Sequence, residues 1–230
     1  DKKQLAEAEK IKRKEAAEKL LQEGVTLADP TRIDVRGNLV CGKDVFIDVN
    51  VVFEGDVRIA EGASIGPHSV ITSSTIGRHT KILSHCNLEH ANIGDNCLVG
   101  PFARLRPGTE LMDSAKAGNF VEIKKSRIGQ KSKVNHLSYV GDAVVGNEVN
   151  VGAGTITCNY DGVNKNQTII EDNVFIGSGV ELVAPIAVKK GATIGAGSTI
   201  TKQAPKDKLT LERAHQKTIP GWKRPKKNTT

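Results

Sequence analysis

Aromatic residues are scarce in this sequence: Phe, Trp and Tyr make up 3% of the 230 residues, whereas 38% are hydrophobic. A core must therefore be built from Val, Ile, Leu and Ala, without the large side chains that anchor many compact domains. Many small and similar layers can bury such residues, as they do in stacked repeats. The composition favours a repeat architecture over a single compact globule.

Long hydrophobic runs are also absent. No stretch of about 18 apolar residues occurs, and the first residues, DKKQLAEAEK, lack the apolar centre of a signal peptide. The four cysteines form no Cys-x-x-Cys pair and no Cys–His cluster with zinc spacing: they are Cys41, Cys86, Cys97 and Cys158. We therefore expect a cytoplasmic protein with free thiols and no membrane partner.

The formal net charge of +7 is concentrated at one end of the chain. Residues 202–230 contain nine basic and two acidic side chains, which accounts for the whole excess. A nucleic-acid partner is not expected, because such a surface would have only this tail and a single aromatic residue, Trp222. Prolines at positions 205, 220 and 225 and the lack of periodicity indicate an irregular basic arm. It is either solvated or captures the phosphate of a ligand.

Residues 1–24 are predicted to form a linker helix. Residues 2–23 are rich in Ala, Leu, Lys and Glu, contain no Gly or Pro, and are followed by Gly24, a typical residue at a helix C-terminus. The apolar positions form a narrow stripe: Leu5, Ile11, Ala16 and Leu20. Such a helix is exposed or linking rather than part of a core. Because the chain begins with Asp1 and not Met, we expect it to follow a missing upstream domain.

From residue 25 the pattern changes to a period of six residues. Ten members of the series are followed directly by glycine. Allowing for one-residue slips, the series is Ile47, Phe53, Ile59, Ile65, Ile71, Ile76, Ile82, Leu88, Ile93, Val99, Leu105, Leu111, Ala117, Ile123, Ile128, Val134, Val140, Val145, Val151, Thr157, Ile170, Ile176, Leu182, Val188, Ile194 and Ile200.

A period of six fits neither a helix nor an ordinary alternating strand. It is typical of a solenoid in which each flat face is one hexapeptide and glycine occupies the turns. Three faces make a coil of about 18 residues, so residues 25–201 make about 10 coils of parallel strands. The polar segment between Ile156 and Ile170 must include an external loop.

Five sequence blocks carry a closer resemblance: GPFARLRPG (100–108), GNFVEIKKS (118–126), NHLSYVGDA (135–143), NVGAGTITCNYDGVNK (150–165) and LVAPIAVKKGATIGAGSTIT (182–201). In this order they resemble the acetyltransferase domain of the bifunctional N-acetylglucosamine-1-phosphate uridylyltransferase/glucosamine-1-phosphate N-acetyltransferase family. The resemblance implies a left-handed parallel β-helix, although parallel crossovers are in general right-handed. It also implies a homotrimer with its sites between subunits.

The activity implied by the resemblance is acetyl transfer from acetyl-CoA, as co-substrate, to the 2-amino group of glucosamine-1-phosphate. The product, N-acetylglucosamine-1-phosphate, belongs to UDP-N-acetylglucosamine biosynthesis for cell-envelope precursors. The family's uridylyltransferase domain has no counterpart in this sequence. Magnesium belongs with that domain, so we expect no metal in residues 1–230.

Acetyl transfer from a thioester to an amine needs a base for the ammonium proton and a donor to the developing oxyanion. Judged by its neighbours in the segment NHLS, His136 would be an ordinary hydrogen-bonded histidine. The resemblance implies instead that His136 is the catalytic base. Glu122 is an accessory candidate that would orient the imidazole.

The resemblance also implies the residues that bind the sugar phosphate. Cationic side chains suit the phosphate, because arginine offers a fork of donors and lysine a point charge. The matching positions are Arg106, Lys124, Tyr139, Asn150 and Lys165. Asn150 has a structural alternative as a ladder residue inside a coil.

A second set of positions matches the acetyl-CoA side: Asn159, Tyr160, Ser178, Ala196 and Arg213. Asn159 and Tyr160 also offer neutral contacts to the sugar. Ser178 can hydrogen-bond the thioester oxygen, and Arg213 would meet phosphates. Trp222 in the basic arm is an accessory candidate that stacks on adenine or covers the site, with anchoring against the solenoid as its alternative.

Two other functions remain open from the sequence. One is a repeat scaffold without catalysis that binds a partner through its arm. The other is a zinc-dependent enzyme, because some hexapeptide-repeat proteins resemble carbonic anhydrases. For zinc, His85 and His90 would be ligands at a five-residue offset, with His68 or His79 as the third.

Overall fold

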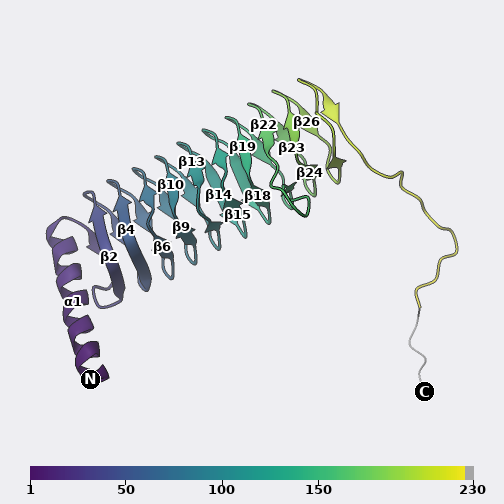
Figure 1. The fold of residues 1–230 in the computed structure, drawn as a ribbon. Coiled ribbons are helices and arrows are strands. Elements are labelled where there is room, and N and C mark those ends of the chain that lie inside the picture. Colours follow the sequence, from purple (N-terminus) through teal and green to yellow (C-terminus); the bar gives the residue numbers. More distant parts are fainter. Residues whose placement is uncertain (226–230) are drawn as a thin grey trace, which may run out of the picture.

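The computed structural model describes residues 1–225 and shows one helix followed by a long stack of short strands (Figure 1). The strands wind into a solenoid whose coils have three faces, named A, B and C in the order in which the chain meets them. Leu98 pairs in parallel with Lys81 and Lys116, its partners 17 and 18 residues away, so one coil consists of three hexapeptides. Face A contains 11 strands, which confirms the predicted solenoid of about 10 coils.

The strands of each face stack in chain order. Face A contains β1 (Thr26–Leu27), β3 (Phe46–Ile47), β5 (Ser64–Ile65), β8 (Lys81–Ile82), β11 (Leu98–Val99), β14 (Lys116–Asn119), β17 (Lys133–His136), β20 (Asn150–Val151), β23 (Phe175–Ile176), β26 (Thr193–Ile194) and β28 (Leu209–Thr210).

Faces B and C begin together in two long strands that turn the corner between them, β2 (Ile33–Cys41) and β4 (Val51–Ile59). Face B continues with β6 (Val70–Thr72), β9 (Asn87–Glu89), β12 (Arg104–Leu105), β15 (Glu122–Lys124), β18 (Tyr139–Gly141), β21 (Ile156–Cys158), β24 (Glu181–Val183) and β27 (Thr199–Ile200). Face C continues with β7 (Thr75–Ile76), β10 (Ala91–Ile93), β13 (Thr109–Leu111), β16 (Arg127–Ile128), β19 (Ala143–Val145), β22 (Thr168–Ile170) and β25 (Ile186–Val188).

Helix α1 (Lys2–Gln22) forms where the sequence predicted a linker helix, and its C-terminal part closes the first coil. The helix ends at Gln22 with Glu23 as its C-cap, and the following Gly24 has a φ of 90°, which only glycine adopts at little cost. The N–H groups of Gly24 and Val25 donate to the carbonyl oxygens of Leu21 and Leu20, which satisfies two carbonyls at the helix end. Ala17 and Leu20 are buried, whereas Leu5 and Ile11 are exposed. The helix therefore covers the solenoid with its last turns alone.

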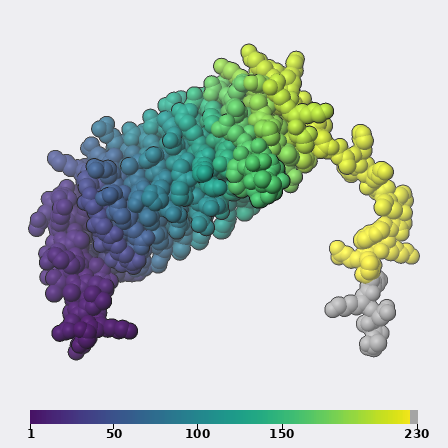
Figure 2. Space-filling view, viewed as in Figure 1, coloured from purple at the N-terminus to yellow at the C-terminus, as the bar shows by residue number. Residues whose placement is uncertain are grey.

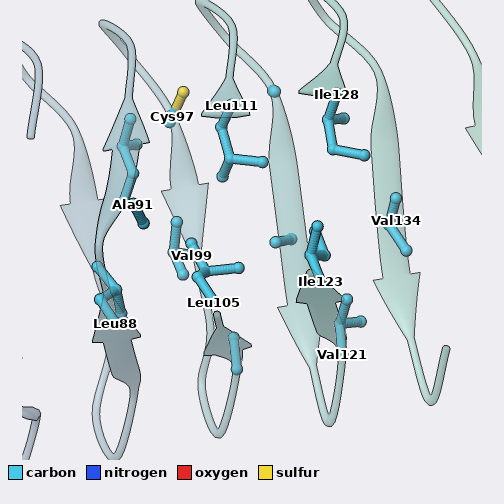
Figure 3. Packing of buried hydrophobic residues seen from close by; sticks show 14 of the residues in the cluster. Leu88, Ala91, Cys97, Val99, Leu105, Leu111, Val121, Ile123, Ile128 and Val134 are labelled. Carbon is cyan, nitrogen blue, oxygen red and sulfur yellow. The ribbon is translucent and has the colours of Figure 1, made fainter. Parts of the chain in front are cut away.

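The core consists of aliphatic ladders along the solenoid axis. Every position of the six-residue series is buried, with an exposed fraction of 4% or less. Leu105 pairs in register with Leu88 in the preceding coil and Ile123 in the following one, and Figure 3 shows such side chains in successive coils. Each layer thus buries its side chains against identical neighbours, which removes the need for aromatic anchors.

Strand pairing continues beyond residue 201, where the six-residue series ends. Ala204 is buried and bridges to Val188, and β28 pairs with β26 through the backbone. Leu209 in β28 is 63% exposed, which explains why the aliphatic pattern gives no sign of this strand. The last five residues of the predicted arm, 226–230, lie outside the described residues. Within residues 1–225, no helix is long and apolar enough to cross a membrane.

Candidate active site

The corner between faces A and B determines the shape of the surface around His136. In each coil one corner residue has a positive φ, between 48° and 73°. We call this set the AB corner ladder; in chain order it is Asn50, His68, His85, Phe102, Phe120, Leu137, Gly154, Gly179 and Gly197. The ladder thus changes from large side chains to glycines one coil after His136.

The large side chains of the AB corner ladder stack on one another outside the solenoid. Ring centroids lie 4.9 Å apart for His68 and His85, 4.9 Å for His85 and Phe102, and 5.2 Å for Phe102 and Phe120. Leu137 follows them and is 63% exposed. These side chains form a ridge that ends at the coil of His136.

The glycines of the ladder leave open space above that ridge. A Cβ atom added to Gly154, Gly179 or Gly197 would have no neighbour closer than 3.7 Å. Because strands are stacked about 4.8 Å apart, the three glycines form a furrow without side chains that runs parallel to the axis. We refer to it as the glycine furrow.

The residues that precede the ladder form one wall of the glycine furrow. The N–H groups of Gly154, Gly179 and Gly197 donate to the carbonyls of His136, Ala153 and Ser178, which stacks these residues coil upon coil. Ala196 comes next in the same row. The structure therefore brings together His136, Ser178 and Ala196, which the sequence nominated, and adds Ala153 between them.

The ring of His136 is exposed at the lower end of the furrow, and its Nδ1 atom lies 2.6 Å from Oδ1 of Asn119. Asn119 is its partner in the register of β14 and β17. The sequence offered Glu122 as the residue that orients the imidazole, but the structure pairs Glu122 with Arg106 instead. Asn119 was not predicted, although its 17-residue offset from His136 is the length of one coil.

Face B carries two of the predicted cations at the end of its strands that leads to face C, since Lys124 directly precedes Lys125, the positive-φ residue of that corner. Arg106 directly follows β12, and Lys124 is the corresponding residue of β15 in the next coil. Tyr139 begins β18 in the coil after that. Arg106 Nη1 donates to Glu122 Oε1 at 2.8 Å. The bond to Glu122 is the main cause of a raised pKa of Arg106. The surface therefore offers a fixed guanidinium and a lysine to an anion.

Asn150 lies elsewhere. It begins β20 on face A, where Lys133 pairs with it from the coil below. Arg106 and Lys124 lie on face B, a different side of the solenoid. One chain therefore does not gather Asn150 and Arg106 around one small ligand. A site containing both requires two copies of the chain.

The predicted external loop lies between β21 and β22, at residues 159–167. Asn159 is buried and donates to the carboxylate of Asp142, and Tyr160 bridges to Lys165. Lys165 Nζ lies 3.9 Å from the ring centroid of Tyr160. The loop therefore presents its predicted binding residues as one packed unit.

Asp161 organises the turn of this loop. It accepts hydrogen bonds from the backbone N–H groups of Asn164 and Val163 and from the side chain of Asn166. These bonds, that of Asn164 first, lower the pKa of Asp161 to about 2. The negative charge is therefore part of the loop's structure at all ordinary pH values.

The C-terminal arm contributes one residue to the furrow. Arg213 lies at its upper end, where Nη1 is 3.4 Å from the carbonyl oxygen of Ala196. The arm then runs away from the solenoid, as Figure 2 shows in yellow, and Trp222 is 66% exposed. Within residues 1–225 of one chain, Trp222 does not approach His136.

The histidines of the zinc alternative are not brought together. His68 and His85 belong to the AB corner ladder, whereas His79 and His90 occupy other corners with positive φ, following faces C and B respectively. A five-residue offset carries the chain along one face to the next corner, so it separates His85 from His90. In the described part of the chain no three His, Cys, Asp or Glu side chains form a group that could hold a metal ion.

Comparisons with known proteins agree with the repeat pattern. The family model described as bacterial transferase hexapeptide (six repeats) matches residues 38–73, and that described as hexapeptide repeat of succinyl-transferase matches residues 167–202. Among solved structures, the UDP-N-acetylglucosamine acyltransferase from Campylobacter jejuni has a TM-score of 0.57 at 17% identity, covering 78% of this chain and 71% of that chain. LpxA from Acinetobacter baumannii has a TM-score of 0.52 at 21% identity, covering 73% and 69%. These likenesses concern the fold, a left-handed parallel β-helix.

Curated relatives are much more similar in sequence. The bifunctional protein GlmU of Ralstonia pickettii (strain 12J) is 59% identical over 224 residues, which are 97% of this chain and 49% of that protein. The bifunctional protein GlmU of Janthinobacterium sp. (strain Marseille) is also 59% identical, over 97% of this chain and 50% of that protein. The chain therefore spans about half the length of the relatives it matches, and over that half it belongs to the GlmU family.

Proposed function

We propose that this chain transfers the acetyl group of acetyl-CoA to the 2-amino group of glucosamine-1-phosphate. The observation that supports this most directly is the position of His136, at the lower end of the glycine furrow and in the coil that follows that of Lys124. From His136 to Ala196 is three coils, or about 14 Å, which suits an extended thioester chain with phosphates at Arg213. Arg106 and Lys124 suit the phosphate of the sugar.

The proposed reaction is direct transfer. The amine nitrogen attacks the thioester carbon, and Nε2 of His136 takes the amine proton as the C–N bond forms. The C–S bond then breaks and the thiolate of CoA leaves with the electron pair. Holding both substrates on one corner lowers the entropic part of the barrier. An acyl-enzyme on Cys158 is not part of this scheme, because burial raises the pKa of its thiol and the negative charge of Glu181 raises it further.

In this proposal the backbone N–H of Ala153, rather than the hydroxyl of Ser178, donates a hydrogen bond to the oxyanion. Ala153 is one coil above His136, and its N–H makes no backbone hydrogen bond within residues 1–225. Ser178 is two coils above His136, or about 10 Å, too far for one thioester oxygen to lie near both side chains. In this proposal Ser178 contacts the chain that leads to the thioester, and a backbone N–H stabilises the developing charge.

We also propose that the working unit is a homotrimer with each site between subunits. The support is the division of the predicted residues: Arg106 and Lys124 lie on face B, whereas Asn150 begins β20 on face A and His136 stands at the corner between the two faces. Trimers formed from a mixture of two inactive variants test whether each site lies between subunits. If Asn150→Ala and His136→Ala chains are each nearly inactive, trimers formed from a mixture should regain part of the activity, because some sites then combine two intact residues. Absence of recovery in mixed trimers would place both residues in the same chain's site.

The decisive experiment is release of CoA thiol from acetyl-CoA in the presence of glucosamine-1-phosphate. The parent chain should turn over, and His136→Ala should lose activity by about 10²-fold or more, as expected for loss of a general base. Undiminished turnover in His136→Ala would refute the role of His136. No turnover by a folded, trimeric parent would favour the scaffold without catalysis, and loss of activity to chelators would favour the metal-dependent alternative.

A further inference from the structure

The bond between Asn119 and His136 is the one side-chain hydrogen bond to the imidazole within residues 1–225. Nδ1 of His136 lies 2.6 Å from Oδ1 of Asn119. Both residues end strands of face A, β14 and β17, and they are register partners. The contact therefore comes from the regular stacking of two coils and does not depend on a mobile loop.

The backbone holds Asn119 in place at the corner. Its carbonyl oxygen accepts a hydrogen bond from the N–H of Leu137, at 3.0 Å, and its side chain is half-buried. The next residue, Phe120, is stacked against Phe102 in the AB corner ladder. The amide is thus fixed beside Nδ1 of the His136 ring, at the corner where the furrow begins.

An amide oxygen can accept but cannot donate a hydrogen bond. With Oδ1 directed at Nδ1, the ring must have its proton on Nδ1, which leaves the lone pair on Nε2. That is the tautomer a general base needs when the amine approaches from the furrow. Because the amide is uncharged, it orients the ring without favouring the charged imidazolium, as a carboxylate would.

We propose that Asn119 is the positioning residue of His136, holding it in the Nδ1–H tautomer with Nε2 directed at the amine. This inference rests on the proposed acetyl transfer for its kinetic consequence. It replaces the role that the sequence suggested for Glu122, whose carboxylate is bonded to Arg106.

The kinetic test compares Asn119→Ala with Asn119→Asp. Asn119→Ala removes the acceptor and should lower kcat about 10- to 100-fold, the usual effect of removing a partner that orients a functional histidine, while both KM values stay within about twofold. Asn119→Asp restores an acceptor and should recover most of kcat. Asn135→Ala is the matched control, because Asn135 adjoins His136 in β17 without bonding to its ring. Wild-type kcat in a folded Asn119→Ala chain would overturn the proposal.

A second measurement separates this inference from the proposed reaction. Selective ¹⁵N labelling of the six histidines gives a tautomer signature for each ring, and the His136 signals are identified by their loss in His136→Ala. The parent should show a protonated Nδ1 and an unprotonated Nε2 at a pH where the ring is neutral, and Asn119→Ala should lose this single signature. A protonated Nε2 in the parent would refute the proposal even if the chain is an active acetyltransferase. The expected signature in an inactive parent would sustain the contact while the proposed reaction fails.

Discussion

Nη1 of Arg106 lies 2.8 Å from Oε1 of Glu122, and each side chain is 36% exposed. The pair spans neighbouring coils of face B and draws the guanidinium of Arg106 to Glu122, two residues before Lys124 in β15. Its contribution to folding is small, because partly exposed ion pairs contribute about 0–1 kcal/mol. The ion pair matters because it fixes the orientation of the Arg106 guanidinium, which we propose binds the sugar phosphate.

Substitution of Glu122 should therefore affect substrate binding and not the proton transfer. Glu122→Ala leaves the guanidinium without its acceptor and should raise the KM for glucosamine-1-phosphate about fivefold, equivalent to about 1 kcal/mol. Glu122→Gln retains an acceptor oxygen and should stay within about twofold of the parent. Steady-state kinetics at saturating acetyl-CoA measure both. A fall in kcat with unchanged KM would show that Glu122 acts through His136 after all.

Asp161 provides a prediction about pH. Its pKa is lowered to about 2 by the hydrogen bonds it accepts, so its support of the loop is complete above the ordinary value of 3.8 and is lost as the pH falls through about 2. We expect the ¹³C carboxyl resonance of Asp161 to remain in its ionised position at pH 3.5. Titration near the ordinary value would show that the turn does not form.

The ladder of the core predicts a localised loss of stability. Leu105 has an exposed fraction of 0% and lies between Leu88 and Ile123. Leu105→Ala should lower the free energy of unfolding by about 2–5 kcal/mol, since neighbouring coils cannot collapse onto the cavity. Arg104→Ala, on the outward side of the same strand, is the control and should change it by less than about 0.5 kcal/mol. Urea unfolding followed by far-UV circular dichroism checks both, and equal effects would contradict the inward ladder.

The core was predictable because one aliphatic side chain per hexapeptide must face inward, whatever the outward residues are. Asn119 was harder to recognise, because an isolated asparagine has no signal until the coil length is known. With a 17-residue coil it falls beside His136. The zinc hypothesis shows the reverse error: His85 and His90 are close in sequence, but a corner of the solenoid separates them.

The glycine furrow was hidden for a related reason. Gly154 and Gly179 are 25 residues apart because the loop at residues 159–167 lengthens that coil, as the pairing of Asn150 with Phe175 shows. A fixed period therefore does not align the two glycines. Residues that we propose act between copies of the chain, such as Asn150, have no signal in the periodicity, because the pattern reports the interior of one solenoid.

Filling the furrow should interfere with the donor substrate. Gly179 has a φ of 66°, and Leu137 shows that this corner accepts leucine at a φ of 48°. Gly179→Leu should fold, at a cost of about 1–2 kcal/mol, and raise the KM for acetyl-CoA at least tenfold. Asn173→Leu is the control, because Asn173 is exposed, has a φ of 57° and precedes the same strand, β23, at the opposite corner. An unchanged KM in Gly179→Leu would remove acetyl-CoA from the furrow.

The lower end of the furrow should set the length of the acyl group. Leu137 closes it in the coil of His136, and the stacked rings of Phe120 and Phe102 continue the ridge below. An acyl chain longer than acetyl would meet this ridge when its carbonyl is at His136.

In Leu137→Gly the furrow extends by one coil, or about 4.8 Å, which is room for two or three further methylenes. Because each buried methylene contributes about 0.8 kcal/mol, kcat/KM for butyryl-CoA relative to acetyl-CoA should rise about tenfold. Leu137→Met keeps the side-chain volume and should leave the ratio unchanged. If both variants retained the parent's preference, the acyl group would have to point away from the ridge, toward the cations of face B.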